Sequence, residues 1–240
     1  MNHCRHLLLC VSLLIGLAST AQDPKRTHVL LYKDRLAAAF DTVKCVKNAV
    51  KINPLLFFRG EIPIYFERAL TPKLSLEVGL GITLRNYLAL SFVGDDADDF
   101  GAGTEIVPNL SYHMGARWYF MDDLEPVGTY LHVEYAHLVY AKDIRAKGAD
   151  GQFTDVTYRD ERTYNDVRLL FGYQTLSFNN NWLVDFYGGA AFRSRNNIIV
   201  TENAIPPAQE NGAVTYDYEV TESSDNVPAF FLGFKLGMGF

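Results

Sequence analysis

Long apolar segments are scarce in this sequence of 240 residues, although 48% of its residues are hydrophobic. Beyond the N-terminus, no stretch is apolar over the roughly 20 residues that a membrane-spanning helix requires, which excludes a helical membrane protein. A phosphate-binding loop, a metal-binding cysteine pattern and a cofactor fingerprint are also lacking, so the sequence predicts no cofactor and no metal. The formal net charge of −6 argues against a nucleic-acid partner.

Cysteine is rare, with three residues in the whole chain. Two of them fall in residues 1–21, which have the pattern of a secretory signal peptide: a polar, basic start, an apolar stretch from Leu7 to Leu17 and a small-residue cleavage site at Ser19-Thr20-Ala21. The apolar stretch is too short for a membrane anchor. Cleavage before Gln22 would leave Cys45 as the one cysteine of the mature chain, which excludes an internal disulfide.

Apolar and polar residues alternate repeatedly from residue 48 to the C-terminus. In the clearest run, Leu74, Leu76 and Val78 share a face with three further apolar residues, and the positions between them are small or polar. A period of two predicts a β-strand, and the 16 Phe, 14 Tyr and 18 Gly are typical of an all-β protein. The alternation predicts eight strands, at residues 48–58, 61–70, 74–85, 105–120, 129–140, 163–176, 182–196 and 227–240.

The connections between these strands differ in length in a nearly regular way, and the short Arg59-Gly60 connection between the first two strands is an exception. Residues 86–104, 141–162 and 197–226 are long, polar segments that join odd strands to even ones, whereas residues 71–73 and 178–181 are short turns that join even strands to odd ones. Transmembrane β-barrels have short periplasmic turns and long outer loops. Residues 48–240 are therefore predicted to form an eight-stranded antiparallel up-and-down transmembrane β-barrel. A soluble lipocalin-like barrel, apolar inside and polar outside, is the alternative, because its strands alternate in the same way.

Residues 22–47 do not share the alternating pattern. We expect them to form a periplasmic lead-in to the barrel. They could contain a short amphipathic helix that includes Leu30, Leu36 and Phe40, or they could be loosely ordered.

The last strand carries a second signal, because Phe234, Leu236, Met238 and Phe240 share its apolar face and Phe240 is the final residue. This arrangement resembles the C-terminal assembly signal of bacterial outer-membrane β-barrels. Short segments that look like those of small Gram-negative envelope barrels are residues 51–55, 65–68 and 76–81. Over residues 48–240 the chain resembles the small barrels of the OmpA/OmpX type, with no peptidoglycan-binding domain after the barrel. The resemblance implies the cell outer membrane, with outer-membrane lipid around the barrel and with the barrel assembly machinery and periplasmic chaperones as partners in transit.

Charged residues occur on the polar face of the predicted strands. If the apolar face contacts lipid, these charges point into the barrel, where they are desolvated and must pair. They are Lys51, Glu67, Glu77, Arg117, Glu134, Arg168, Asp185 and Lys235. We expect a structural ion-pair network that fills the interior, and a gated polar path for protons or small ions is the alternative. Eight strands leave room for little more than side chains, so a large pore is not expected.

Two pairs of residues have the types that a hydrolase needs. Ser111 lies near His113 on one strand, and His132 lies near Glu134 on the next. Nucleophilic catalysis also needs a third group that orients the base, and the sequence has no flanking motif that supports one. We therefore do not expect catalytic residues here.

Two of the predicted outer loops have distinctive compositions. The first contains Asp95, Asp96, Asp98 and Asp99, which could hold Ca²⁺ or could simply be solvated. Residues 216–219 (Tyr-Asp-Tyr-Glu) resemble a binding loop in composition, and they could equally extend the strands above the membrane.

The function that the sequence favours is non-enzymatic. We expect an envelope-structural role or a surface interaction through the long outer loops, with an unknown surface ligand. A small-solute or ion channel is one alternative, and a lipid-A-modifying outer-membrane enzyme is another.

Overall fold

The structure is a computed structural model, and it describes residues 32–42, 45–85, 101–121, 123–177, 181–206 and 214–240. The chain divides into two compact units, residues 1–35 and 36–240, and the second contains the sheet. Helix α2 (Tyr32–Thr42) lies in the segment expected as a lead-in, whereas the predicted signal segment lies outside the described residues. Within the described ranges, no helix has the length and apolar character needed to cross a membrane.

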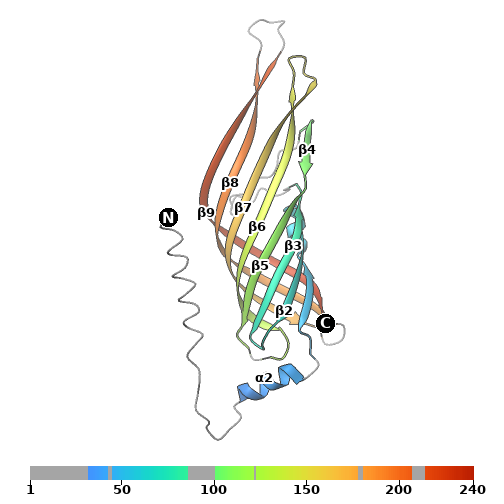
Figure 1. The fold of residues 1–240 in the computed structure, drawn as a ribbon, viewed down its shortest axis with the longest axis vertical. Helices are drawn as coiled ribbons and strands as arrows, with labels where there is room; N and C mark the ends of the chain where they lie inside the picture. The colour runs from blue at the N-terminus through green and yellow to red at the C-terminus, as the bar shows by residue number, and fades with distance from the viewer. Residues whose placement is uncertain (1–31, 43–44, 86–100, 122, 178–180, 207–213) are drawn as a thin grey trace, which may run out of the picture. The chain divides into compact units, whose positions relative to one another are not determined.

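One antiparallel sheet, which closes on itself, forms the second unit (Figure 1). The described residues form nine strands: β1 (Asn48–Ile52), β2 (Glu61–Ala69), β3 (Leu74–Thr83), β4 (Thr104–Val107), β5 (Asn109–Tyr119), β6 (Gly128–Lys147), β7 (Phe153–Leu176), β8 (Trp182–Ile205) and β9 (Thr215–Gly239). Pairing of β1 with β9 and of β6 with β7 closes the ring through β1-β2-β3-β5-β6-β7-β8-β9. The all-β, antiparallel up-and-down prediction is thereby confirmed.

The predicted count of eight strands is wrong, because the described residues form nine. The strand expected at residues 105–120 is divided at Pro108 into β4 and β5. Proline has no N–H group and cannot donate to a strand ladder, so it interrupts the pairing. Both pieces pair with β6. Strand β4 pairs with residues 141–144 of β6, and β5 pairs with residues 130–137. The extra strand therefore lengthens one wall of the ring and adds no member to the closed circuit.

The first predicted strand, residues 48–58, is also too long. Strand β1 ends at Ile52, and a short helix follows, α3 (Pro54–Phe58). The Asn53 side chain accepts a hydrogen bond from Leu55 N at 3.2 Å, which is an N-cap, and proline is favoured in the first helical turn. Asn53 is fully buried, and its Nδ2 donates to the hydroxyl of Tyr187 at 2.6 Å. The Asn-Pro pair thus ends the strand and anchors the helix to the barrel wall.

Four strands are much longer than the sequence predicts. Strands β6 to β9 have 20 to 25 residues, against 5 to 11 for β1, β2, β3 and β5. Most of residues 141–162 and 197–226, expected to be loops, form the outer halves of these strands. Figure 1 shows the two long hairpins, β6–β7 and β8–β9, extending past the ends of the shorter strands.

The two faces of the barrel wall have opposite chemistry. Along β2, Ile62, Ile64 and Phe66 are exposed, while Glu61 before them and Glu67 after them are buried. The same contrast holds around the ring, where large apolar side chains such as Leu80 (71% exposed), Leu110 (76%) and Leu232 (86%) point outward. The interior of this barrel therefore contains many polar and charged side chains beside its buried apolar ones, whereas large apolar side chains are exposed on the outside.

Candidate functional site

Six of the eight charged residues predicted to line the interior form one group inside the barrel. We call it the Glu77 cluster, and it consists of Lys51, Glu67, Glu77, Arg117, Asp185 and Lys235, each at most 2% exposed. They come from six different strands, β1, β2, β3, β5, β8 and β9. The cluster therefore joins strands from most of the ring.

Glu77 is the centre of this cluster, because three cations donate to its carboxylate. Lys235 Nζ lies 2.5 Å from Oε1, and Arg117 Nη2 lies 2.5 Å from Oε2. Lys51 Nζ lies 3.2 Å from the same Oε2. Hydrogen bonds between charged groups are roughly twice as strong as neutral ones. Because three cations share Glu77, its loss would leave more charge uncompensated than the loss of any other residue of the cluster.

Lys51 and Arg117 extend the cluster to two further carboxylates. Lys51 donates to Glu67, and Arg117 Nη1 lies 2.7 Å from Asp185 Oδ2. The guanidinium carbon of Arg117 also lies 4.5 Å from the centre of the Tyr130 ring. Lys51 and Arg117 thus each contact more than one carboxylate, which compensates the cost of burying their charges.

Neutral residues that sequence reasoning missed complete the hydrogen bonding. Gln174 Oε1 accepts from Lys51 Nζ at 2.7 Å and from Arg117 Nη1 at 3.0 Å. Tyr119 donates to Glu67 at 2.8 Å, and Tyr130 donates to Asp185. Their position along the strands could have identified them, because Tyr119, Tyr130 and Gln174 lie on the inward-facing side of β5, β6 and β7.

The other two predicted residues, Glu134 and Arg168, lie in a second group with Asp166 and Arg193. We call it the Asp166 cluster. Arg168 Nη1 lies 2.7 Å from Glu134 Oε1, and Arg168 Nη2 lies 2.8 Å from Asp166 Oδ2. Arg193 Nε lies 2.7 Å from Asp166 Oδ1. Sequence reasoning missed Asp166 and Arg193, although both have the inward parity of their strands.

His113 is held between two carboxylates. Its Nε2 lies 2.5 Å from Glu61 Oε1, and its Nδ1 lies 3.1 Å from Glu134 Oε1. Ser111 is buried on the same strand, but both ring nitrogens of His113 are already engaged. A histidine in this state has no nitrogen with which to accept a proton from the serine hydroxyl, as a nucleophilic mechanism requires.

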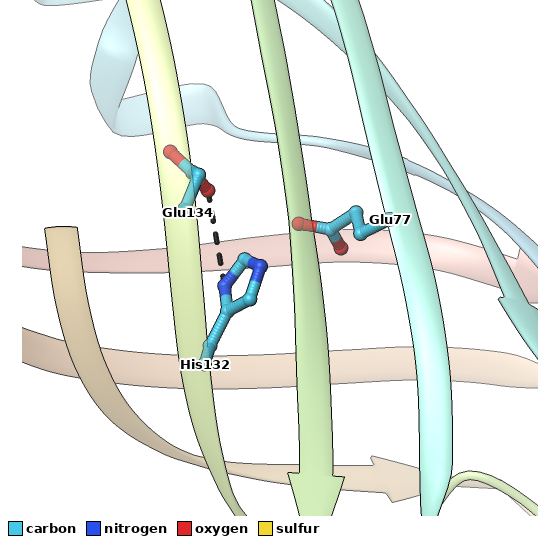
Figure 2. Close-up of side chains that lie close together, drawn as sticks. All are labelled: Glu77, His132 and Glu134. Carbon is cyan, nitrogen blue, oxygen red and sulfur yellow. Dashed lines mark ion pairs between the residues drawn. The ribbon is translucent and has the colours of Figure 1, made fainter. Parts of the chain in front are cut away.

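Glu77, His132 and Glu134 are close enough to suggest a metal site. One ligand atom from each lies within 4.8 Å of the others, and all three are buried. Figure 2 shows His132 between the two carboxylates, with its Nδ1 3.8 Å from Glu134 Oε2. The ring fits there because Gly115 beside it has no side chain, and a Cβ would lie 2.4 Å from His132 Nε2. Both oxygens of Glu77 already accept from Lys235 and Arg117, so a divalent ion would have to displace these cations.

An apolar layer lies beyond the charged clusters, toward the long hairpins. Ala136, Leu138, Tyr140 and Tyr164 form a buried hydrophobic cluster, and the rings of Tyr140 and Tyr164 are 5.9 Å apart. Arg193 from the Asp166 cluster contacts this layer, with its guanidinium carbon 4.6 Å from the Tyr164 ring centre. These four residues line the inner side of the neighbouring strands β6 and β7.

The remaining predicted features fall in different places. Phe234, Leu236, Met238 and Phe240, expected as an assembly signal, are partly or largely exposed on the outer side of β9 and its end. Residues 216–219 lie within β9, so they extend a strand and do not form a loop. The acidic segment 95–99 lies outside the described residues.

Comparison of the chain with models of protein families, with curated proteins and with solved structures gave no significant match.

Proposed function

We propose that this chain is a bacterial outer-membrane β-barrel of the OmpA/OmpX-like kind, exported with a cleaved signal at residues 1–21. Its role is non-enzymatic: it stabilises the envelope and presents the long β6–β9 hairpins for interaction at the cell surface. The observation that carries the proposal is the inversion of the barrel, with large apolar side chains outside and paired charges inside.

The inversion favours a membrane over water as the surrounding medium. Around the ring, outward residues such as Leu80, Leu110 and Leu232 are largely exposed, and they would be costly to leave in water at roughly 25 cal/mol per Å² of apolar surface. A lipocalin-like barrel would have the reverse arrangement. A closed ring also satisfies the backbone hydrogen bonds that hydrocarbon cannot satisfy.

A filled interior supports a structural role over a pore. The Glu77 cluster and the Asp166 cluster occupy the centre of the barrel with paired side chains. The apolar side chains of Leu138, Tyr140 and Tyr164 follow them along β6 and β7 toward the hairpins. These features favour a closed barrel whose interior charges hold the strands together.

The proposal is tested by fractionation. The protein should be found in the outer-membrane fraction and should migrate faster on a gel before boiling than after boiling, because folded barrels resist detergent. Absence from that fraction would overturn the proposal. Conductance in a planar bilayer would instead favour a channel, and lipid-A deacylation or palmitoyl transfer by the purified protein would favour an enzyme.

A further inference from the structure

The outward face of the barrel changes from apolar to polar at one level of the wall. One row of cross-strand partners includes Met114, Val167 and Phe192, each of which is more than half exposed. The next outward-facing row toward the hairpins, which we call the boundary row, consists of Tyr112, His137, Asn165, Ser194 and Asn226. Under the proposed function, hydrocarbon ends and lipid headgroups begin at the boundary row.

A hollow of about 480 Å³ lies directly beyond the boundary row, on strands β7, β8 and β9, and we call it the outer-face pocket. Its volume is within the range of roughly 300–1,000 Å³ that is usual for small-molecule sites. The described lining consists of one row of Thr163, Asn196 and Ser224, a second row of Glu161, Ile198 and Glu222, and Asn197 and Ser223 between them.

The strand register places the outer-face pocket on the side of the wall that faces the membrane in the proposed function. Side chains two positions apart on a strand point to the same face. Glu161 and Thr163 therefore share the outward face of Val167. Asn196 and Ile198 share the outward face of Phe192 in the same way, and the pairing of β8 with its two neighbours has no register shift over these residues. A ligand in the pocket would therefore lie next to the lipid around the apolar band.

The lining offers hydrogen-bond donors and acceptors side by side. The Ser224 hydroxyl donates to Asn196 Oδ1 at 2.7 Å, which uses the oxygen of that amide and leaves its two N–H groups as donors. In the next row, the carboxylates of Glu161 and Glu222 are acceptors on the two sides of Ile198. A sugar ring has hydroxyl groups that both donate and accept, and it has a C–H face that packs on an aliphatic side chain. The pocket therefore has the groups that complement a saccharide.

The charge of the pocket restricts the ligand further. The described lining contains two carboxylates and no cation, so it would repel an anionic group such as a phosphate. Hydroxyl groups that donate to a carboxylate instead form charge-assisted hydrogen bonds, which are roughly twice as strong as neutral ones. A neutral sugar therefore fits the pocket better than a phosphorylated one.

We propose that the outer-face pocket binds the neutral sugar headgroup of a membrane glycolipid. The sugar accepts hydrogen bonds from the Asn196 amide and donates to the carboxylates of Glu161 and Glu222. The acyl chains lie against the apolar row on the other side of the boundary row, at Val167 and Phe192. This inference deepens the proposed function and rests on it, because it names the class of membrane lipid that the barrel recognises.

Nanodiscs test the site, with the folded protein in phosphatidylcholine and with an increasing fraction of glucosyl-diacylglycerol as the probe. The NMR signals of the Asn196 side-chain amide should shift with the glycolipid fraction, and those of Asn53, which is buried inside the barrel, should not. Phosphatidylglycerol, an anionic lipid without a sugar ring, should leave the Asn196 signals unchanged. Methyl glucoside, added to discs without glycolipid, should bind far more weakly, because the membrane does not hold it beside the pocket.

Substitutions on the two faces of the wall identify the residues. Glu161→Gln and Glu222→Gln keep the shape of the side chain and remove its charge, so each should weaken glycolipid binding about tenfold. Glu219→Gln makes the same change on the opposite face of β9, at an exposed position, and should leave binding unchanged. The gel shift on boiling confirms that each variant is folded.

Unchanged Asn196 signals at every glycolipid fraction, equal shifts with phosphatidylglycerol and with the glycolipid, or equal weakening by Glu222→Gln and Glu219→Gln would overturn the inference. Binding of methyl glucoside as tight as that of the glycolipid would overturn the membrane as the source of the sugar. Failure of the proposed function is a separate result, because it appears as absence from the outer-membrane fraction of cells, whatever the nanodisc titrations give.

Discussion

Ion pairs inside the barrel and ion pairs on the long hairpins use the same residue types but differ in burial. The partners in the Glu77 cluster have at most 2% of their side chains exposed. In the hairpins, Arg159 and Asp143 are 48% and 27% exposed, and Lys147 and Glu202 are 26% and 32% exposed. Water and salt screen the outer pairs, whereas loss of one inner partner leaves a buried charge without compensation. The comparison predicts that the inner pairs determine stability and the outer pairs contribute little.

The largest effect is expected at Glu77. Replacing it with alanine leaves Lys51, Arg117 and Lys235 without their shared carboxylate, and removal of one buried partner typically costs about 3–5 kcal/mol. Urea unfolding in lipid vesicles, followed by the fluorescence of Trp118 and Trp182, should show a much lower midpoint.

Two further variants make this test specific. Arg117→Ala should give a similar loss, since Arg117 contacts both Glu77 and Asp185. Glu222→Ala, an exposed carboxylate on β9, serves as the matched control and should leave the midpoint unchanged. If Glu77→Ala and Arg117→Ala unfold at the wild-type urea concentration, the inner network does not stabilise the barrel.

A smaller effect is expected at Asn53, a buried but uncharged residue. Asn53→Ala removes both the cap of α3 and the hydrogen bond to Tyr187, and an unsatisfied buried group costs about 1–3 kcal/mol. The urea midpoint should fall by less than for Glu77→Ala, and Asn226→Ala on the exposed part of β9 should not change it. A loss equal to that of Glu77→Ala would show that burial, and not charge, separates the two regions.

The barrel wall was predictable from the sequence because its two faces carry opposite side chains, exposed apolar ones outside and buried charged ones inside. This contrast makes the alternation strong, and the alternation predicts the antiparallel strands and the closed ring. The outer hairpins were misread as loops because many of their residues, such as 201–205 and 219–226, are exposed. Strands with water on both sides need no alternation. Local breaks at Asn53-Pro54 and at Pro108 were missed because the alternation was followed across them.

The charged interior was predictable as a set of residues but not as a set of contacts. Parity along a strand gives the face on which a residue lies, and all eight predicted residues are buried. Which residues meet depends on the register and tilt of strands that are distant in sequence. Lys51 and Arg117 converge on Gln174 in this way, whereas Arg168 meets Asp166 and Glu134 in the second cluster.

A test of the outer region is the cross-strand pair between Arg159 and Asp143. Arg159 Nε lies 2.5 Å from Asp143 Oδ1 and Nη2 lies 3.2 Å from Oδ2, so the geometry is bidentate. Even so, exposed pairs contribute only about 0.2–1 kcal/mol. Arg159→Ala should shift the urea midpoint slightly at low ionic strength and not detectably at high salt. A loss comparable to that of Glu77→Ala would remove the distinction between the two regions.

The smallest effect is expected from the protonation of Glu202, which links the two hairpins. The hydrogen bond from Lys147 Nζ lowers the pKa of Glu202 below its usual value, and the hydroxyl of Tyr218 donates to the same carboxylate at 2.9 Å. A lowered pKa means that the contact contributes stability above the usual pKa of glutamate, and that this contribution is lost as the pH falls through the lowered value. NMR titration of the Glu202 side-chain carboxyl should therefore have a midpoint below that of an unperturbed glutamate. Lys147→Met should bring the midpoint back toward the usual value without changing the unfolding of the barrel. If Lys147→Met leaves the titration midpoint of Glu202 unchanged, the ion pair between Lys147 and Glu202 does not hold the hairpins together in solution.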